Sequence, residues 1–254
     1  QPSYLTTETK SGSTIRIDRV KSAANEYVPT SFTQTNAAKT ILQYKTLGGR
    51  KRLTAVIAPQ QPKTQCGSEE EAEKHEGCRA LIFTYQTAAE LGISAELGER
   101  LTKITYYAPG FRVGSWEVAR YKYDSSGRLV EEWDPRVSPA LPEKYAYGAE
   151  NQLTSITPAG QKPWALEYGS FEEEVGGRRL TAVKRATLLS SPSEAKTTIA
   201  YNVPVSGSAA PYDLSASAIG AWGQQDVPVS ATAVFPPSEE PSSPPTAYTK
   251  ATVY

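Results

Sequence analysis

Few side chains in this sequence of 254 residues have the types and spacing that catalysis requires. His75 is the only histidine, so a Ser-His-Asp triad or a histidine general base would have to use it. It lies in an acidic stretch without apolar neighbours, which is typical of a solvated surface histidine. The sequence contains no Gly-x-Ser-x-Gly elbow and no phosphate-binding glycine loop. These observations predict a protein that is not an enzyme.

A pair of carboxylates is the remaining catalytic arrangement, because a glycosidase needs only two. Asp124 and Asp134 are the best-placed candidates. Each also has a structural explanation, since Asp124 begins a turn and Asp134 precedes Pro135 at the end of an expected strand. We therefore expect both to stabilise turns, and a carbohydrate-active enzyme with paired carboxylates is the second alternative function.

Both cysteines, Cys66 and Cys78, lie in an insertion at residues 60–79. A disulfide between them would contribute about 3 kcal/mol by constraining the unfolded chain, and it would indicate an oxidising compartment. Free thiols are one alternative. A metal site with His75 and a glutamate is the other, although structural zinc usually has more closely paired cysteines. The disulfide is the favoured interpretation, and no cofactor or metal is predicted.

Composition narrows the class of protein further. Tyrosine outnumbers phenylalanine by 15 to 5, which favours β structure with half-buried rings. The formal net charge is zero, so no nucleic-acid partner is expected. No apolar run approaches the roughly 20 residues that span a bilayer, and no signal peptide is visible at the start.

A two-strand unit recurs along the chain, and it must position all of these residues. Each unit has a tyrosine in its first strand and a leucine in its second: Tyr44 and Leu53, Tyr85 and Leu101, Tyr123 and Leu129, Tyr147 and Leu153, and Tyr168 and Leu180. The third unit has the shortest connection, in which Asp124 and Gly127 supply the turn before Arg128. Five matched copies predict a repeat architecture.

The segment from Tyr123 to Leu129 resembles the Tyr-Asp-x-x-Gly-Arg-Leu core of the YD-repeat family, also called RHS repeats. This family includes bacterial RHS proteins, shell subunits of insecticidal toxin complexes, and teneurins. The fourth unit departs from the core, with Gly148 in place of Asp and Gln152 in place of Arg. The resemblance implies an all-β fold of repeated antiparallel hairpins, forming a curved, spiralling sheet that is an arc of a shell. Asp134-Pro135 lacks the Gly-Leu of the family's self-cleavage motif, so that activity is not expected.

The repeats divide the chain into three parts. Residues 1–40 are expected to be N-terminal strands leading into the repeats, and residues 41–203 are the hairpins with their cysteine-containing insertion. Residues 204–254 contain a Pro/Ser-rich segment and the start of a further strand. That segment is either a flexible linker or an ordered strap anchored by Trp222 and Phe235. The final strand and the lack of methionine suggest a piece of a longer chain.

These features predict a structural segment of a secreted or cell-surface shell that encloses or displays another, toxin-like domain. The implied partners are further repeats of a parent chain or copies of this chain, together with an enclosed C-terminal effector domain. The first alternative is a carbohydrate-binding or adhesion module, in which exposed tryptophans would stack on glycans: Trp116, Trp133, Trp164 and Trp222. The recurring Arg52, Arg100, Arg128 and Arg179 are expected to pair with turn carboxylates and strand carbonyls and to cover aromatic rings.

Overall fold

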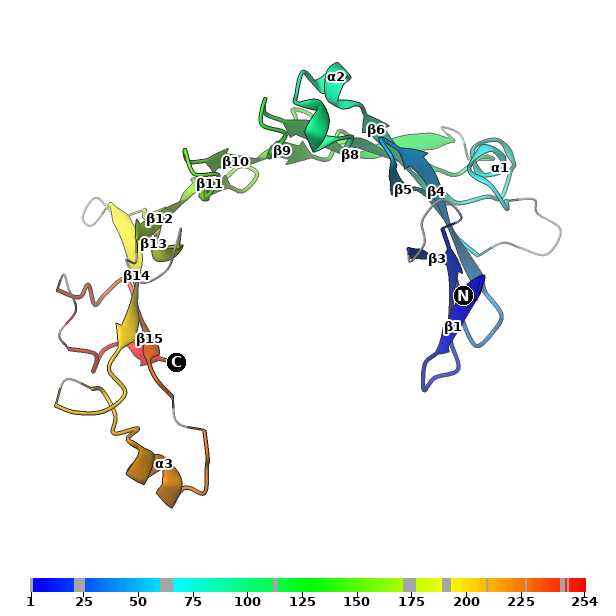
Figure 1. Cartoon of the computed structure of the whole chain (residues 1–254). Coiled ribbons are helices and arrows are strands. Elements are labelled where there is room, and N and C mark those ends of the chain that lie inside the picture. Colours follow the sequence, from blue (N-terminus) through cyan, green and yellow to red (C-terminus); the bar gives the residue numbers. More distant parts are fainter. Residues whose placement is uncertain are drawn as a thin grey trace. The chain divides into compact units, whose positions relative to one another are not determined.

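The computed structural model describes residues 2–20, 26–59, 66–111, 114–170, 177–188, 193–208, 210–226, 228–242, 245 and 247–254. The chain divides into two compact units, Gln1–Pro142 and Glu143–Tyr254. Within each unit, antiparallel strands follow one another along the chain (Figure 1). The prediction of an all-β fold built from repeated hairpins is therefore confirmed.

In the first unit each strand pairs with its neighbours in sequence. Its strands are β1 (Tyr4–Glu8), β2 (Thr14–Arg19), β3 (Tyr27–Thr33), β4 (Lys39–Leu47), β5 (Arg50–Ile57), β6 (Ala80–Gln86), β7 (Arg100–Tyr107), β8 (Ser115–Tyr123) and β9 (Leu129–Trp133). β1 is exposed along its whole length, and among the described strands it pairs with β2 and stands at the end of the strand order, as an edge strand does.

The second unit follows the same rule of pairing. Its strands are β10 (Glu143–Tyr147), β11 (Leu153–Thr157), β12 (Trp164–Ser170), β13 (Arg178–Ala186), β14 (Glu194–Val203), β15 (Ala231–Phe235) and β16 (Thr252–Val253). β16 extends the sheet beyond β15. The described helices of the chain are short: α1 (Glu69–Lys74), α2 (Ala88–Leu91), the 3-10 helix η1 (Ala95–Leu97) and α3 (Ala216–Ala221).

Most of the described strand residues are half-buried, and the main strand-to-strand contacts among them are between strands that follow one another in sequence. Buried side chains form small local clusters. One lies where α1 covers β5 and β6, around Ile57 and Ile82, and another lies between β14 and β15, around Val203 and Phe235.

Candidate functional site in the repeated hairpins

Each repeat places its tyrosine directly opposite its leucine across the hairpin. The registered partners are Tyr44 and Leu53, Tyr85 and Leu101, Tyr123 and Leu129, Tyr147 and Leu153, and Tyr168 and Leu180. In all five hairpins the register shifts immediately before the tyrosine. The residues that define the repeat in sequence therefore form one recurring cross-strand contact, which we call the rung.

The register shift leaves the residue after each leucine without a partner, as in a β-bulge. The bulged residues are Thr54, Thr102, Val130, Thr154 and Thr181. Three of these threonines donate their hydroxyl to the carbonyl that precedes the tyrosine: Thr54 to Gln43 (3.5 Å), Thr102 to Thr84 (3.3 Å) and Thr181 to Glu167 (3.2 Å). The side chain thus replaces part of the ladder hydrogen bonding that the bulge interrupts. The sequence pattern indicates the leucine but does not predict the role of the threonine that follows it.

The tyrosines also connect successive hairpins. The Tyr85 hydroxyl donates to the carbonyl of Leu53 (3.0 Å), and the Tyr123 hydroxyl donates to that of Leu101 (2.7 Å). Burial raises the pKa of both phenols further above neutral pH, where a tyrosine hydroxyl is a protonated donor in any case. Tyr201, which no leucine motif follows in the sequence, makes the same bond to Leu180 (2.9 Å). Each bond ties a hairpin to the leucine of the preceding rung.

The N-terminal hairpin β2–β3 shares this arrangement without the signature residues. Ile17 pairs with Pro29, and the register shift leaves Thr30 bulged. The Thr30 hydroxyl lies 3.5 Å from the carbonyl of Arg16, in the place of the repeat threonines, but its one hydrogen is donated to the Asp18 carboxylate. Residues expected to lead into the repeats therefore include a hairpin of the same construction, which the sequence conceals because the tyrosine and leucine are replaced.

Three of the four recurring arginines contact backbone carbonyls, a turn carboxylate or a ring, whereas the buried Nε of Arg52 has no hydrogen-bond partner among the described residues. Arg100 donates to the carbonyl of Gly127 (3.0 Å) and to that of Leu97. Arg128 forms an ion pair with the turn residue Asp124 (2.8 Å). Arg179 lies 5.2 Å from the centre of the Tyr201 ring, a cation–π distance. These contacts are structural in character.

Asp124 and Asp134 each organise a local turn. Asp124 accepts hydrogen bonds from the backbone amides of Ser126 (2.9 Å) and Arg128 (3.0 Å). Desolvation raises the pKa of Asp124, but the bonds from Arg128 and Ser126 outweigh it, and the pKa is lowered. Hydrogen bonds from the side chain and amide of Arg136 lower the pKa of Asp134 to about 2. Neither carboxyl has the raised pKa that a general acid needs near neutral pH.

The turn at Gly127 is covered by the connection between β6 and β7. Gly127 is buried and has a φ of 70°. A Cβ atom there would lie 2.9 Å from a methyl carbon of Leu97 and 3.3 Å from one of Ile93. The connection that carries α2 and η1 therefore holds the turn of the following hairpin, and Arg100 completes the contact through the Gly127 carbonyl.

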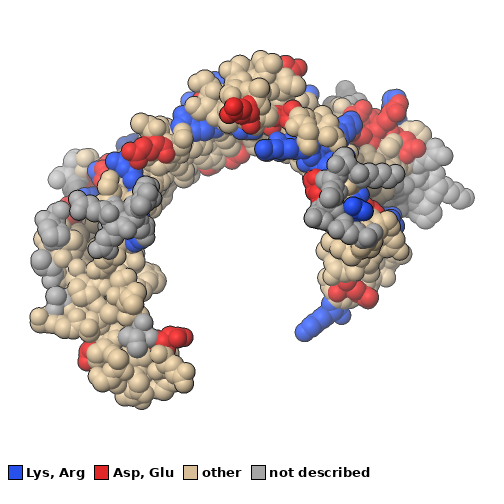
Figure 2. All heavy atoms as spheres, viewed as in Figure 1, with Lys and Arg blue, Asp and Glu red and all other residues tan. Residues whose placement is uncertain are grey.

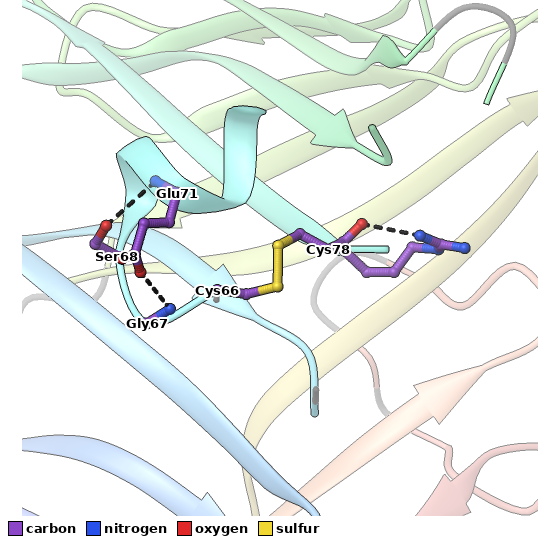
Figure 3. The surroundings of a disulfide bond; sticks show 6 residues. Cys66, Gly67, Ser68, Glu71 and Cys78 are labelled. Atoms are coloured by element: carbon purple, nitrogen blue, oxygen red, sulfur yellow. Dashed lines mark hydrogen bonds between the residues drawn. A yellow bond between two sulfur atoms is a disulfide. The ribbon is translucent and has the colours of Figure 1, made fainter. Parts of the chain in front are cut away.

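Cys66 and Cys78 are joined by a disulfide with a Cα–Cα separation of 5.8 Å, and both are 1% exposed. Figure 3 shows the bond beside α1, whose N-cap Ser68 accepts from the Glu71 amide. The Gln43 side chain of β4 bonds the Gly67 carbonyl (2.9 Å) and the Glu69 amide (2.8 Å), which holds this loop to the sheet. Residues 60–65 of the expected insertion lie outside the described residues.

The metal alternative does not fit this geometry. Both sulfur atoms are bonded to each other and are therefore not metal ligands. His75 ends α1 and is exposed. Acidic side chains gather over α1 (Figure 2), but the described part of the chain contains no cluster of three or more His, Cys, Asp or Glu residues suited to a metal ion.

The tryptophans do not share one environment. Trp116 stacks on Tyr106 at 6.0 Å, and Arg185 lies 4.7 Å from the Trp164 ring centre. Trp133 is half-buried in β9, whereas Trp222 is 75% exposed. Trp222 therefore does not anchor the strap, and this part of the expectation was wrong.

Ion pairs hold the described part of the Pro/Ser-rich segment against the second unit. Glu240 pairs with Lys196 of β14 (3.0 Å), and Glu239 pairs with Lys250 (2.6 Å). Phe235, which is 2% exposed, lies 6.1 Å from Tyr248 between ring centres. Residues 243, 244 and 246 lie outside the described residues. The described portion thus has the contacts of a strap.

No protein-family model matches the chain, and no curated protein matches it. Solved structures do resemble it. One is the TcdB2-TccC3 crystal structure, with 14% identity over 76% of this chain and a TM-score of 0.35. Another is the Tc holotoxin pore of Photorhabdus luminescens, carrying a TccC3 mutation, with 13% identity over 79% of this chain and a TM-score of 0.35. This chain spans 12% of the length of each matched chain.

Among the described residues, no helix has the length and apolar character needed to cross a membrane.

Proposed function

We propose that this chain is a structural segment of a YD-repeat shell that encloses or displays another domain. The observation that carries the proposal is the rung, which recurs with the same register and the same bulge in five hairpins. A repeated contact of this kind builds a sheet by adding one hairpin after another. The repeated contact therefore lengthens the sheet and keeps its hairpins mechanically connected.

The partial exposure of the strand residues to solvent supports the proposal that this sheet is part of a shell wall. Most of its described strand residues are half-buried, and the main strand-to-strand contacts among them are between neighbours in sequence. The open edge at β1 is available for a further strand. We therefore propose that the edge strands of this sheet pair with further repeats of a longer parent chain or with copies of this chain. We also propose that the resulting shell encloses an effector-like domain.

The buried disulfide supports a secreted or cell-surface location, because such bonds form and persist in oxidising compartments. We also propose that the chain is not an enzyme. The two candidate carboxylates are engaged in turns, and the one histidine of the sequence lies exposed at the end of α1.

Limited proteolysis of a longer natural polypeptide that carries this segment tests the proposal. An enclosed domain would resist protease in the wild type and become sensitive when a rung is broken by Tyr123→Ala. A domain cut at the same rate in both proteins would contradict enclosure. Turnover of a sugar or peptide substrate that disappears in Asp124→Asn or Asp134→Asn would contradict a non-enzymatic role.

A further inference from the structure

An open hollow of about 470 Å³ lies on the first unit, formed by side chains of β2 to β5 and Val20. Val28 and Leu42 supply apolar surface, and the polar groups come from Asp18, Arg19, Thr30, Tyr44, Thr46 and Lys51. Its size lies within the range of small-molecule sites, and a few polar groups on an apolar floor are typical of them. The enclosure of another domain does not by itself require this hollow.

The hollow lies where the connection between hairpins is incomplete. Tyr44 belongs to the first full repeat, and the preceding hairpin has Pro29 in the place of the leucine. Tyr85 and Tyr123 donate to the preceding leucine carbonyl, whereas the Tyr44 hydroxyl has no hydrogen bond among the described residues. Burial raises the pKa of Tyr44, so its hydroxyl is a protonated donor at neutral pH.

The charges around the hollow favour an anion. The charge of Asp18 is matched by Arg16, whose guanidinium lies 2.8 Å from the carboxylate, and Thr30 also donates to it. Lys51 lines the hollow, and it has no carboxylate partner within the described part of the chain. An incoming carboxylate would therefore meet uncompensated positive charge at Lys51.

We propose that this hollow binds a small sugar acid, a hydroxylated ring bearing one carboxylate. The carboxylate pairs with Lys51 and accepts the Tyr44 hydroxyl hydrogen. The ring hydroxyls bond Thr46 and the unprotonated Asp18, and the apolar face of the ring rests on Val28 and Leu42. A uronic acid has this combination of groups, whereas a neutral sugar lacks the carboxylate.

The test is an NMR titration of the full chain with glucuronate, followed through backbone amide shifts. Shifts are expected at Tyr44, Thr46 and Lys51, with glucose producing much weaker ones. Lys51→Gln is expected to weaken binding about tenfold by removing the charge pair. Tyr44→Phe keeps the ring and is expected to weaken binding several-fold.

Lys10→Gln is the matched control, because Lys10 is an exposed lysine in the same unit outside the hollow. It is expected to leave the affinity for glucuronate unchanged, and each variant is checked for the native pattern of amide shifts. The proposal is overturned if glucuronate produces no shifts around the hollow, if Lys51→Gln binds as the wild type does, or if glucose binds equally well. None of these results bears on the shell proposal, which depends on the rungs.

Discussion

The Tyr123 hydroxyl donates to the carbonyl of Leu101 across 2.7 Å, and this bond joins two hairpins that are each closed by a tyrosine–leucine pair. Tyr123 lies on β8 and Leu101 on β7, so the bond runs between strands that belong to successive repeats. One side chain therefore takes part both in closing its own hairpin and in attaching that hairpin to the one before it.

Tyr123→Phe is expected to lower the free energy of unfolding by about 1 kcal/mol, because it leaves the half-buried Leu101 carbonyl without its donor while keeping the ring. Urea denaturation followed by circular dichroism measures the change. Tyr212→Phe is the control, since Tyr212 is 61% exposed, and its effect is expected to be close to zero. Equal effects of the two changes would show that the hydroxyl has no role in joining the hairpins.

The bulged position of the repeat allows the effect on stability to be predicted both for removing and for adding a threonine hydroxyl. Thr181→Val keeps the shape of the side chain but removes the bond to the Glu167 carbonyl, and it is expected to cost about 0.5–1 kcal/mol. Val130 occupies the same place in the third repeat, so Val130→Thr is expected to be neutral or stabilising. Chemical denaturation of both variants checks this, and a loss of stability in Val130→Thr together with none in Thr181→Val would contradict it.

Gly127→Ala is expected to lower stability for two reasons, the positive φ of the backbone and the crowding of the new Cβ atom. A second glycine with the same φ but without crowding separates the two effects. Gly127 and Gly160 both have a φ of 70°, but a Cβ at Gly160 meets nothing within 4 Å, whereas one at Gly127 lies 2.9 Å from Leu97. Gly160→Ala is expected to cost about 1 kcal/mol from the backbone conformation alone.

Gly127→Ala is expected to cost more, by about 1 kcal/mol or above, because the covering connection must also move. Thermal unfolding of both variants measures the difference. If the two midpoints fall together, the connection that carries α2 and η1 does not hold the turn.

Reduction of the Cys66–Cys78 disulfide is expected to destabilise the first unit by about 3 kcal/mol. Hydrogen exchange should then increase in β5 and β6, which the disulfide loop covers. The measurement is exchange with and without reductant. A double variant, Cys66→Ala with Cys78→Ala, serves as control and should not respond to reductant; a wild type that is equally indifferent would show that other contacts hold the loop.

The Asp134–Arg136 pair gives a pH prediction. The folded pKa of Asp134 is lowered from 3.8 to about 2, so the stability it contributes is present above the unfolded value and is lost as the pH falls through about 2. Carboxyl carbon shifts measured by NMR against pH should give this pKa. Arg136→Gln should return it toward 3.8, whereas Arg120→Gln, in the same hairpin, should not; an unchanged pKa in Arg136→Gln would exclude Arg136 as the cause.

The sequence was sufficient to identify the repeats and the disulfide, because each depends on residue types at fixed spacing. Tyr123, Asp124 and Gly127 predict a hairpin from the local sequence, because Asp and Gly are residues that favour turns. The bulge could not be read in this way, because a register shift depends on how Thr102 and Thr84 meet across two strands. The contact of Leu97 with Gly127 was also hidden, since it joins a loop to a turn in a different hairpin.

The N-terminal hairpin shows a further limit of the sequence pattern. Ile17 and Pro29 reproduce the pairing of the rung while replacing both of its signature residues, so the backbone arrangement survives a complete change of the motif. Pro29 keeps a backbone carbonyl at the place of the leucine, but no hydrogen bond joins that carbonyl to Tyr44 among the described residues.

The threonine bulge has a consequence for how such a chain can evolve. Among the described residues the main strand contacts are between hairpins that follow one another in sequence, and each repeat shifts its register at the same place. Duplicating or deleting one whole hairpin therefore returns the following strand to the same phase. Gain or loss of a single residue inside a strand has no such remedy, because it turns every later side chain of that strand to the opposite face. The length of the protein can thus change in steps of one repeat.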